Sequence, residues 1–237
     1  MTNRLLATIL VGVLCIQLYG QNKFIPEWNI GVGFGPTVAS MSIVPTNQSN
    51  SLDVKSISQL HGGISARYIS EKNLGFIAEL NYSQAGWESK YDVDNGYKHI
   101  HKLNYIELPF MTHIYFGSKK IRGFVNIGPK VQYLISEKET LNDKLQAWLT
   151  NEKPDPIVNE IAQYNKKADR NFDYGLVAGL GGELRTAIGN FSLEGRYYMG
   201  FGDIYNSRKS DDFSRSAHRI MSVRLTYYIK PFFKKPK

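Results

Sequence analysis

His99 and His101 are the side chains of this 237-residue sequence whose type and spacing could best do chemistry. Residues i and i+2 of a strand lie on one face of a sheet, so the two imidazoles could ligate a metal ion together. Asp92 or Asp94, a few residues earlier, could supply a carboxylate for acid–base work. These residues form the first candidate site.

The surroundings of the two histidines do not match a catalytic motif. Neither a serine partner nor a Glu-x-x-His spacing accompanies them, and spacing alone cannot establish a triad. His61 and His218, the other candidates, add no such pair. We therefore interpret these histidines as solvated loop side chains. We predict no catalytic, cofactor-binding or metal-binding residue, and no enzymatic activity.

The segment LNYIELPFMTHIYFG at 103–117 indicates how the chain positions its polar side chains. Alternation with period two gives one mostly apolar face, made of Asn104, Ile106, Leu108, Phe110, Thr112 and Ile114. Glu107, Pro109 and His113 lie on the opposite face, which would be costly in a soluble core. In a transmembrane barrel the apolar face meets lipid and the polar face lines the interior.

Similar alternation predicts eight strands, at 28–40, 57–70, 74–88, 100–117, 121–135, 171–186, 189–202 and 216–230. The links between them alternate strictly between long and short, and the three short ones are EKN, SKK and IGN. Outer-membrane barrels have short periplasmic turns and long external loops. The sequence therefore predicts an all-β fold, an eight-stranded antiparallel transmembrane β-barrel.

Ten ionisable side chains are expected on the inward face, as four carboxylates, five fixed cations and one histidine. They are Arg67, Glu79, Glu107, His113, Lys130, Glu183, Arg185, Glu194, Arg196 and Arg224. An eight-stranded barrel has an interior just wide enough for side chains to fill it, and unpaired charges there would be costly. We interpret the ten as a structural ion-pair network that plugs the lumen.

The chain is rich in aromatic residues, with 15 Tyr, 12 Phe and 3 Trp. Trp28, Trp87, Tyr198 and Tyr228 lie towards strand ends. Transmembrane barrels carry girdles of aromatic side chains at the two membrane interfaces. We expect these four rings to belong to such girdles.

The N-terminal segment has the pattern of a secretory signal peptide. Arg4 precedes an apolar run from Leu5 to Leu18, and the small residue Gly20 follows. We predict a signal peptide at 1–20, cleaved near Gly20–Gln21, and a barrel domain at 21–237. The single cysteine, Cys15, would be removed, so no disulfide is expected.

The link at 136–170 is the longest and has helical periodicity on both sides of a PDP break. We expect a helical insertion, a small hairpin, in this external loop. Its apolar stripe either packs on the barrel rim or docks a partner protein. The residues of this candidate docking loop are Leu141, Leu145, Trp148, Ile157, Ile161 and Tyr164.

The segment 103–117, followed by GFVNIGPKVQYLIS, resembles the PorT-type outer-membrane barrel domain of Bacteroidetes. In that family a Y-x-E-x-P strand is followed by a turn and a G-P strand, and Gln21 after the cleavage site also suits the group. The resemblance spans roughly 28–230. It implies an eight-stranded barrel in the outer membrane, and its best-known member is implicated in type IX secretion.

These observations favour an exported, monomeric barrel in the cell outer membrane. We expect a non-enzymatic structural or interaction protein, an accessory of protein secretion or surface assembly, with a small-solute channel or transporter as the alternative. Its partners would be outer-membrane lipid and other outer-membrane or secretion-system proteins. The net charge of +8 comes from scattered residues, so we expect no nucleic-acid binding.

Overall fold

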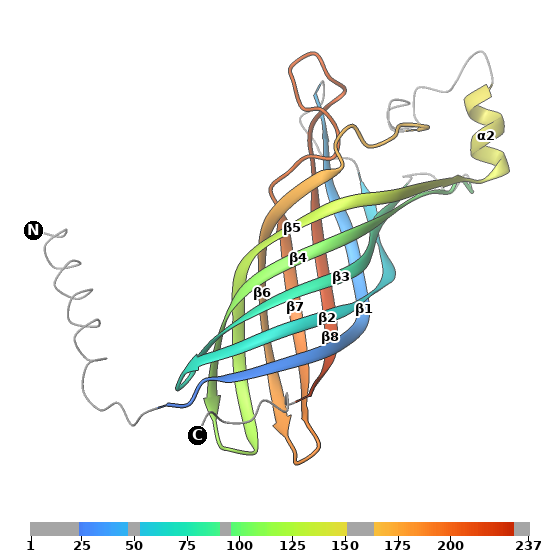
Figure 1. Ribbon diagram of the computed structural model, residues 1–237. Helices are drawn as coiled ribbons and strands as arrows, with labels where there is room; N and C mark the ends of the chain where they lie inside the picture. The colour runs from blue at the N-terminus through green and yellow to red at the C-terminus, as the bar shows by residue number, and fades with distance from the viewer. Residues whose placement is uncertain (1–23, 47–52, 91–95, 151–163, 230–237) are drawn as a thin grey trace, which may run out of the picture.

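Eight antiparallel strands form a closed barrel in the computed structural model (Figure 1). Each strand pairs with the next along the chain, and β1 pairs with β8 to close the ring. The strands are β1 (Glu27–Pro45), β2 (Val54–Glu71), β3 (Leu74–Ser89), β4 (His99–Gly117), β5 (Ile121–Leu141), β6 (Phe172–Arg185), β7 (Asn190–Gly200) and β8 (Phe213–Ile229). The predicted all-β fold is confirmed.

The structure describes residues 24–46, 53–90, 96–150 and 164–229. Several sequence-based predictions fall outside these ranges. They concern the signal peptide at 1–20, the carboxylates Asp92 and Asp94, and the second half of the predicted helical hairpin, with Ile157 and Ile161.

The three short turns lie at one end of the barrel, and the strand ends that the longer links join lie at the other (Figure 1). The turn between β2 and β3 contains Asn73 at φ 71°, a left-handed conformation that Asn tolerates better than most residues. Gly117 before the turn between β4 and β5 has φ 118°, and a Cβ there would lie 2.7 Å from the Ile121 carbonyl oxygen. We call the two ends the short-turn end and the long-loop end.

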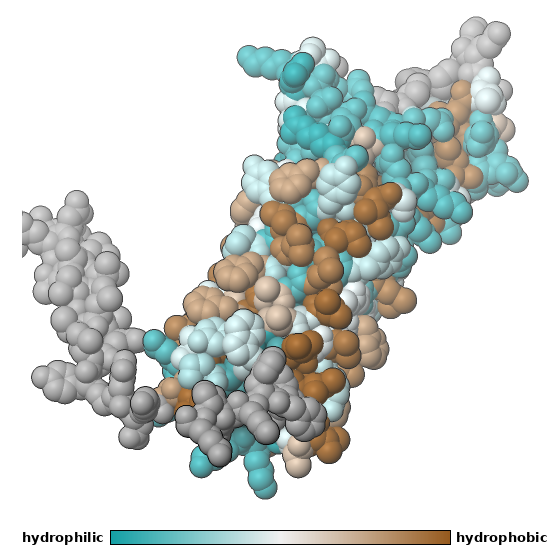
Figure 2. Space-filling view, viewed as in Figure 1, coloured by the Kyte–Doolittle hydropathy of each residue, from teal (hydrophilic) through white to brown (hydrophobic). Residues whose placement is uncertain are grey.

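The outer wall of the barrel is apolar (Figure 2). Phe34 and Leu180 are among many large apolar side chains that are exposed there, while charged residues such as Arg224 are fully buried inside. The inverted pattern expected from the sequence is therefore present. Hydrophilic side chains gather at the long-loop end in the same view (Figure 2).

The aromatic girdle prediction is correct for one residue of four. Trp28 is 51% exposed on the outer wall, but Trp87, Tyr198 and Tyr228 are buried in the interior. Alternation accounts for this, since Trp87 has the parity of Glu79, Tyr198 that of Arg196 and Tyr228 that of Arg224, and all of these face inward. Nearness to a strand end alone therefore does not place a ring in a girdle.

The predicted 136–170 loop begins later than expected. Residues 136–141 continue β5, because each of them pairs with β4, from Ser136 opposite Asn104 to Leu141 opposite His99. A short helix, α2 (Asp143–Thr150), follows and lies away from the barrel wall (Figure 1). We call residues 99–104 of β4 and 136–141 of β5, which pair with each other, together with α2, the β4–β5 extension. In the described ranges, no helix is long and apolar enough to cross a membrane.

Candidate functional site

Glu79 is the centre of the largest charge cluster in the lumen. Arg196 donates to both of its carboxylate oxygens, from Nη1 at 2.7 Å and from Nη2 at 2.8 Å. Nη2 of Arg196 also donates to Glu194 at 2.7 Å, and Nε of Arg224 lies 3.8 Å from Glu79. All four side chains are buried, where an unpaired charge would be costly. Two carboxylates balance two guanidinium groups at close range.

A second cluster lies nearer the short-turn end. Arg67 donates to Glu183 from the opposite side of the lumen and also to Oδ1 of Asn29, at 2.8 Å from Nη2. Arg185 is only half-buried, lies 3.9 Å from Glu183, and pairs with Glu27 at 2.9 Å. Arg185 therefore belongs to the rim of the lumen.

The remaining members of the predicted set are Glu107, Lys130 and His113. Lys130 donates to Glu107 at 2.6 Å and lies 3.6 Å from the centre of the Tyr198 ring. His113 is hydrogen-bonded through Nδ1 to Oδ1 of Asn126 at 2.7 Å, so this partner is an amide and not a carboxylate. The ten residues thus form three ion-paired groups with His113 beside them.

A small cavity lies between the charge clusters. Its volume is about 20 Å³, and its lining includes His61, Asn81, Glu107, Lys130 and Arg196. That volume holds about one water molecule. Both ring nitrogens of His61 are buried here without a hydrogen-bond partner among the described side chains, so a bound water is a suitable partner for them.

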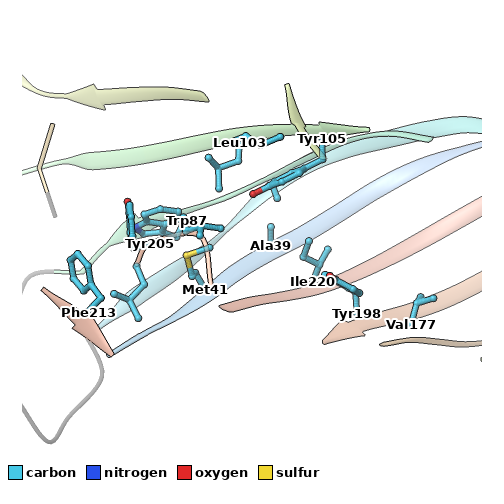
Figure 3. Close-up of a cluster of buried hydrophobic side chains, with 14 of the residues drawn as sticks. Ala39, Met41, Trp87, Leu103, Tyr105, Val177, Tyr198, Tyr205, Phe213 and Ile220 are labelled. Atoms are coloured by element: carbon cyan, nitrogen blue, oxygen red, sulfur yellow. The ribbon is translucent and has the colours of Figure 1, made fainter. Parts of the chain in front are cut away.

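Apolar side chains fill the lumen towards the long-loop end (Figure 3). This apolar plug includes Ala39, Met41, Trp87, Leu103, Tyr105, Tyr205, Phe213 and Ile220. The Tyr205 and Phe213 rings stack with centres 5.0 Å apart, and the Tyr105 hydroxyl lies 2.8 Å from Nε2 of His218. The sequence predicted a charged interior, but charges fill only part of it.

A β-bulge in β5 controls which side chains face inward above the plug. Leu134 pairs with Tyr105, whereas Ser136 pairs with Asn104, so Ile135 is an extra residue with no partner in β4. Beyond the bulge the inward positions of β5 change from even to odd numbers. Glu137 and Glu139 therefore lie on the same face as His99 and His101.

His99 and His101 are buried, so their interpretation as solvated loop side chains is wrong. Nε2 of His99 lies 2.7 Å from Oε1 of Glu139, and its Nδ1 lies 2.7 Å from the Ser89 hydroxyl. Nε2 of His101 lies 3.3 Å from Oε2 of Glu137. We call these five residues the histidine cluster. His61 and His218 are likewise buried, because all of these side chains point into the filled interior.

The histidine cluster lies outside the apolar belt, since the outward-facing residues at this level are the exposed Lys102, Lys138 and Thr140 together with the half-buried Ile100. Burial lowers the pKa of His101 below its ordinary value, against the opposing attraction of the glutamates. Burial alone would raise the pKa of Glu139, but hydrogen bonds from His99 and from the Asn165 backbone outweigh it and lower this pKa.

The described members of the candidate docking loop contact one another. Leu145 and Trp148 of α2 pack with Tyr164 in a small apolar cluster, and Leu141 packs against it. Tyr97 also contacts this cluster, with its ring centre 6.1 Å from that of Trp148. The described part of this stripe packs against Tyr97 and Tyr164, and the docking of a partner protein by the loop stays a prediction.

Sequence reasoning found the two histidines but missed Ser89, Glu137 and Glu139. The available signal was the pair of motifs His-x-His and Glu-x-Glu on strands that must be neighbours in an antiparallel meander. Simple alternation along β5 would have placed both glutamates on the outer face, because Lys130 and Gln132 face inward. Only the bulge brings them to the histidines.

Comparisons with known proteins found similar solved structures. The solved structure of the outer membrane protein OprG from Pseudomonas aeruginosa is similar at 13% sequence identity and a TM-score of 0.52, over 86% of this chain and 97% of that one. Ail of Yersinia pestis, solved with the heparin analogue sucrose octasulfate, matches at 10% identity and a TM-score of 0.41, over 87% and 100%. Neisserial surface protein A matches at 11% sequence identity and a TM-score of 0.43, over 88% of this chain and 100% of that one.

No curated protein matches this chain. A family model, described as the outer membrane protein beta-barrel domain, matches residues 19–206, which is most of the sequence. The match and the closed eight-stranded ring agree in showing that the chain is an outer-membrane β-barrel protein and belongs to the outer membrane protein beta-barrel domain family.

Proposed function

We propose that this protein is a closed, non-enzymatic barrel whose role is structural or interactive. The observation that carries the proposal is the filled interior. Paired charges occupy one part of the lumen, an apolar plug occupies the other, and the cavity between the clusters holds about one water molecule. The alternative, a small-solute channel or transporter, requires a path through these side chains.

The feature available for interaction is the β4–β5 extension. β5 has 21 residues and β4 has 19, more than most strands of the barrel, and both carry backbone and side chains beyond the apolar belt. A protein that conducts nothing and projects such an element is suited to hold partners at the membrane surface. The resemblance to PorT-type barrels supports an accessory role in type IX-like secretion or surface assembly.

Conductance of the full-length protein in planar bilayers tests the closed lumen. We expect no current steps with the native protein and clear steps with Trp87→Ala combined with Tyr205→Ala, because the pair removes two rings of the apolar plug. Phe110→Ala on the exposed wall is the matched control and should stay silent. Steps of equal size from native and plug-deleted protein would overturn the closed barrel and favour the channel.

Crosslinking in native membranes tests the interaction role. Replacing residues 143–163 with a short Gly-Ser linker should remove specific secretion or surface-assembly subunits from the crosslinked products, because it removes α2. A control variant, Arg208→Ala with Lys209→Ala, alters exposed residues of the β7–β8 link at the same end and should keep them. An identical set of crosslinked proteins with and without α2 would contradict a docking role for the extension.

A further inference from the structure

The histidine cluster brings three metal-ligand side chains together above the plug. Ligand atoms of His99, His101 and Glu139, one from each, all lie within 4.8 Å of one another. Tetrahedral Zn²⁺ with ligands at about 2.0–2.1 Å has donor atoms about 3.3 Å apart. Small side-chain adjustments are therefore enough to place all three donors around one ion.

Each imidazole is oriented by a hydrogen bond at one ring nitrogen, which leaves the other nitrogen to face a metal ion, as in metal-binding histidines. The Ser89 hydroxyl lies 2.7 Å from Nδ1 of His99, which directs Nε2 towards Glu139. Glu137 lies 3.3 Å from Nε2 of His101, and Nδ1 of that ring is buried without a hydrogen-bond partner among the described residues. This nitrogen is therefore available to ligate a metal ion.

The walls of the cluster hold the rings and exclude water. Trp87 stacks on His101 with ring centres 4.6 Å apart, and Tyr164 lies edge-on to His99 at 5.0 Å. The His99 and His101 side chains are 0% and 1% exposed, whereas the Glu139 side chain is 17% exposed. An ion could therefore enter past the glutamate, and the fourth position would face the same side.

We propose that His99, His101 and Glu139 bind one divalent first-row transition-metal ion, of which Zn²⁺ is the natural probe. Two imidazole nitrogens and one carboxylate suit Zn²⁺ and its neighbours, whereas Ca²⁺ and Mg²⁺ prefer sites made only of oxygen. The ion joins β4 to β5 where both leave the barrel. Because Glu139 also accepts a hydrogen bond from the Asn165 backbone at 3.1 Å, the ion also stabilises the returning chain.

Zinc binding by the full-length protein in detergent micelles is the first test. After treatment with a chelator, the protein is titrated with Zn²⁺ against a chromophoric competitor. We expect one ion per chain, with no competition from a hundredfold excess of Ca²⁺ or Mg²⁺. Co²⁺ in place of Zn²⁺ should give the visible absorption of a four-coordinate site. Failure of the native protein to bind Zn²⁺ would overturn the proposal without involving any variant.

Substitutions then assign the ligands. His99→Gln, His101→Gln and Glu139→Gln should each weaken Zn²⁺ binding at least a hundredfold, and Glu137→Gln should weaken it about 10- to 100-fold. His61→Gln, which removes a buried histidine elsewhere in the lumen, is the matched control and should bind like the native protein. Heat-modifiability on a gel establishes that each variant is folded.

Two results separate the metal site from a hydrogen-bonded cluster that holds no ion. Zn²⁺ should slow proteolysis within the β4–β5 extension of the native protein and leave the His99→Gln, His101→Gln double variant unchanged. Binding that survives in the folded double variant would place the ion elsewhere and contradict the assignment. The outcome does not depend on the conductance experiment, because the cluster lies above the plug.

Discussion

Single charges inside this barrel are tolerated because each has an opposite charge close by, at hydrogen-bonding distance for most and at 3.8 Å for Arg224. Glu79 receives both arms of Arg196, and Arg67 is held by Glu183 and Asn29. Small residues leave room for these large side chains. A Cβ at Gly33 would lie 2.6 Å from Nε of Arg224, so a larger residue would displace the guanidinium. The large charged side chains of the interior thus pack into space that the glycines leave open.

Removing one partner of the Glu79–Arg196 pair should be more damaging than removing both. Glu79→Gln leaves the buried Arg196 with Glu194 as its one carboxylate and leaves Arg224 with none, at a cost of about 3–5 kcal/mol in unfolding free energy. The double variant Glu79→Gln, Arg196→Met should recover part of that loss. Urea unfolding in micelles, followed by tryptophan fluorescence, gives the four corners of the cycle. Strictly additive losses would show that the two side chains do not stabilise each other.

At the scale of elements, the β4–β5 extension is held at its tip by the contacts of one side chain, Asn142. Oδ1 of Asn142 accepts from the backbone N–H groups of Leu145 and Lys98, at 3.2 and 3.1 Å. Its Nδ2 donates to the Gly96 carbonyl oxygen at 2.7 Å. One side chain therefore begins α2 and ties the start of β4 to the end of β5.

Asn142→Ala should loosen the extension and leave the barrel intact. Loss of a helix-capping side chain costs about 0.5–2 kcal/mol, and the bond to Gly96 is lost with it. Amide hydrogen exchange should accelerate in 96–102 and 138–150 and stay unchanged in β7 and β8. Gln146→Ala, an exposed helix position, is the matched control. Equal acceleration in β7 and β8 would show that the extension is not a separate unit of stability.

The bulge in β5 gives a second prediction for this element. Deleting Ile135 removes the unpaired residue and lets Ser136 stay opposite Asn104, so the pairing on both sides is preserved. Deleting Val125, which pairs regularly with Ile114, forces one side of the strand to change faces. We expect most of the first variant and little of the second to refold, as read from heat-modifiability. Equal yields would argue against the register described for β5.

The whole molecule is stabilised by an apolar outer wall and a filled interior. Leu180 is 71% exposed on that wall and pairs with Gly195, level with the middle of β7. Ile188 is 74% exposed in the turn between β6 and β7, at the short-turn end. The two positions are equally accessible, so they differ chiefly in their depth along the wall.

Arginine at these two positions should report on that depth. Leu180→Arg should cost about 2–4 kcal/mol in lipid vesicles, whereas Ile188→Arg should cost about 0–1 kcal/mol, because a charge near the interface keeps its water. Unfolding free energies in vesicles provide the comparison. Similar costs at both positions would contradict the placement of β6 across the membrane.

The eight strands, the inverted faces and the alternation of short and long links followed from the sequence alone. Alternation is a local property, since neighbouring side chains of a strand point to opposite faces, so residues 103–117 showed their two faces without any tertiary information. The ten ionisable residues were assigned to the inner side for the same reason. Their actual partners, such as Arg67 with Glu183, depend on which strands face each other across the lumen.

Tertiary structure decided the features that depend on pairing between strands. One unpaired residue, Ile135, reversed the faces of β5 and brought Glu137 and Glu139 to His99 and His101. Trp87 lies on the inward face that its parity with Glu79 indicates, but only the tertiary structure shows that its ring fills the lumen and stacks on His101. Local periodicity sets a side chain's face, whereas bulges and packing across the barrel determine what that face meets.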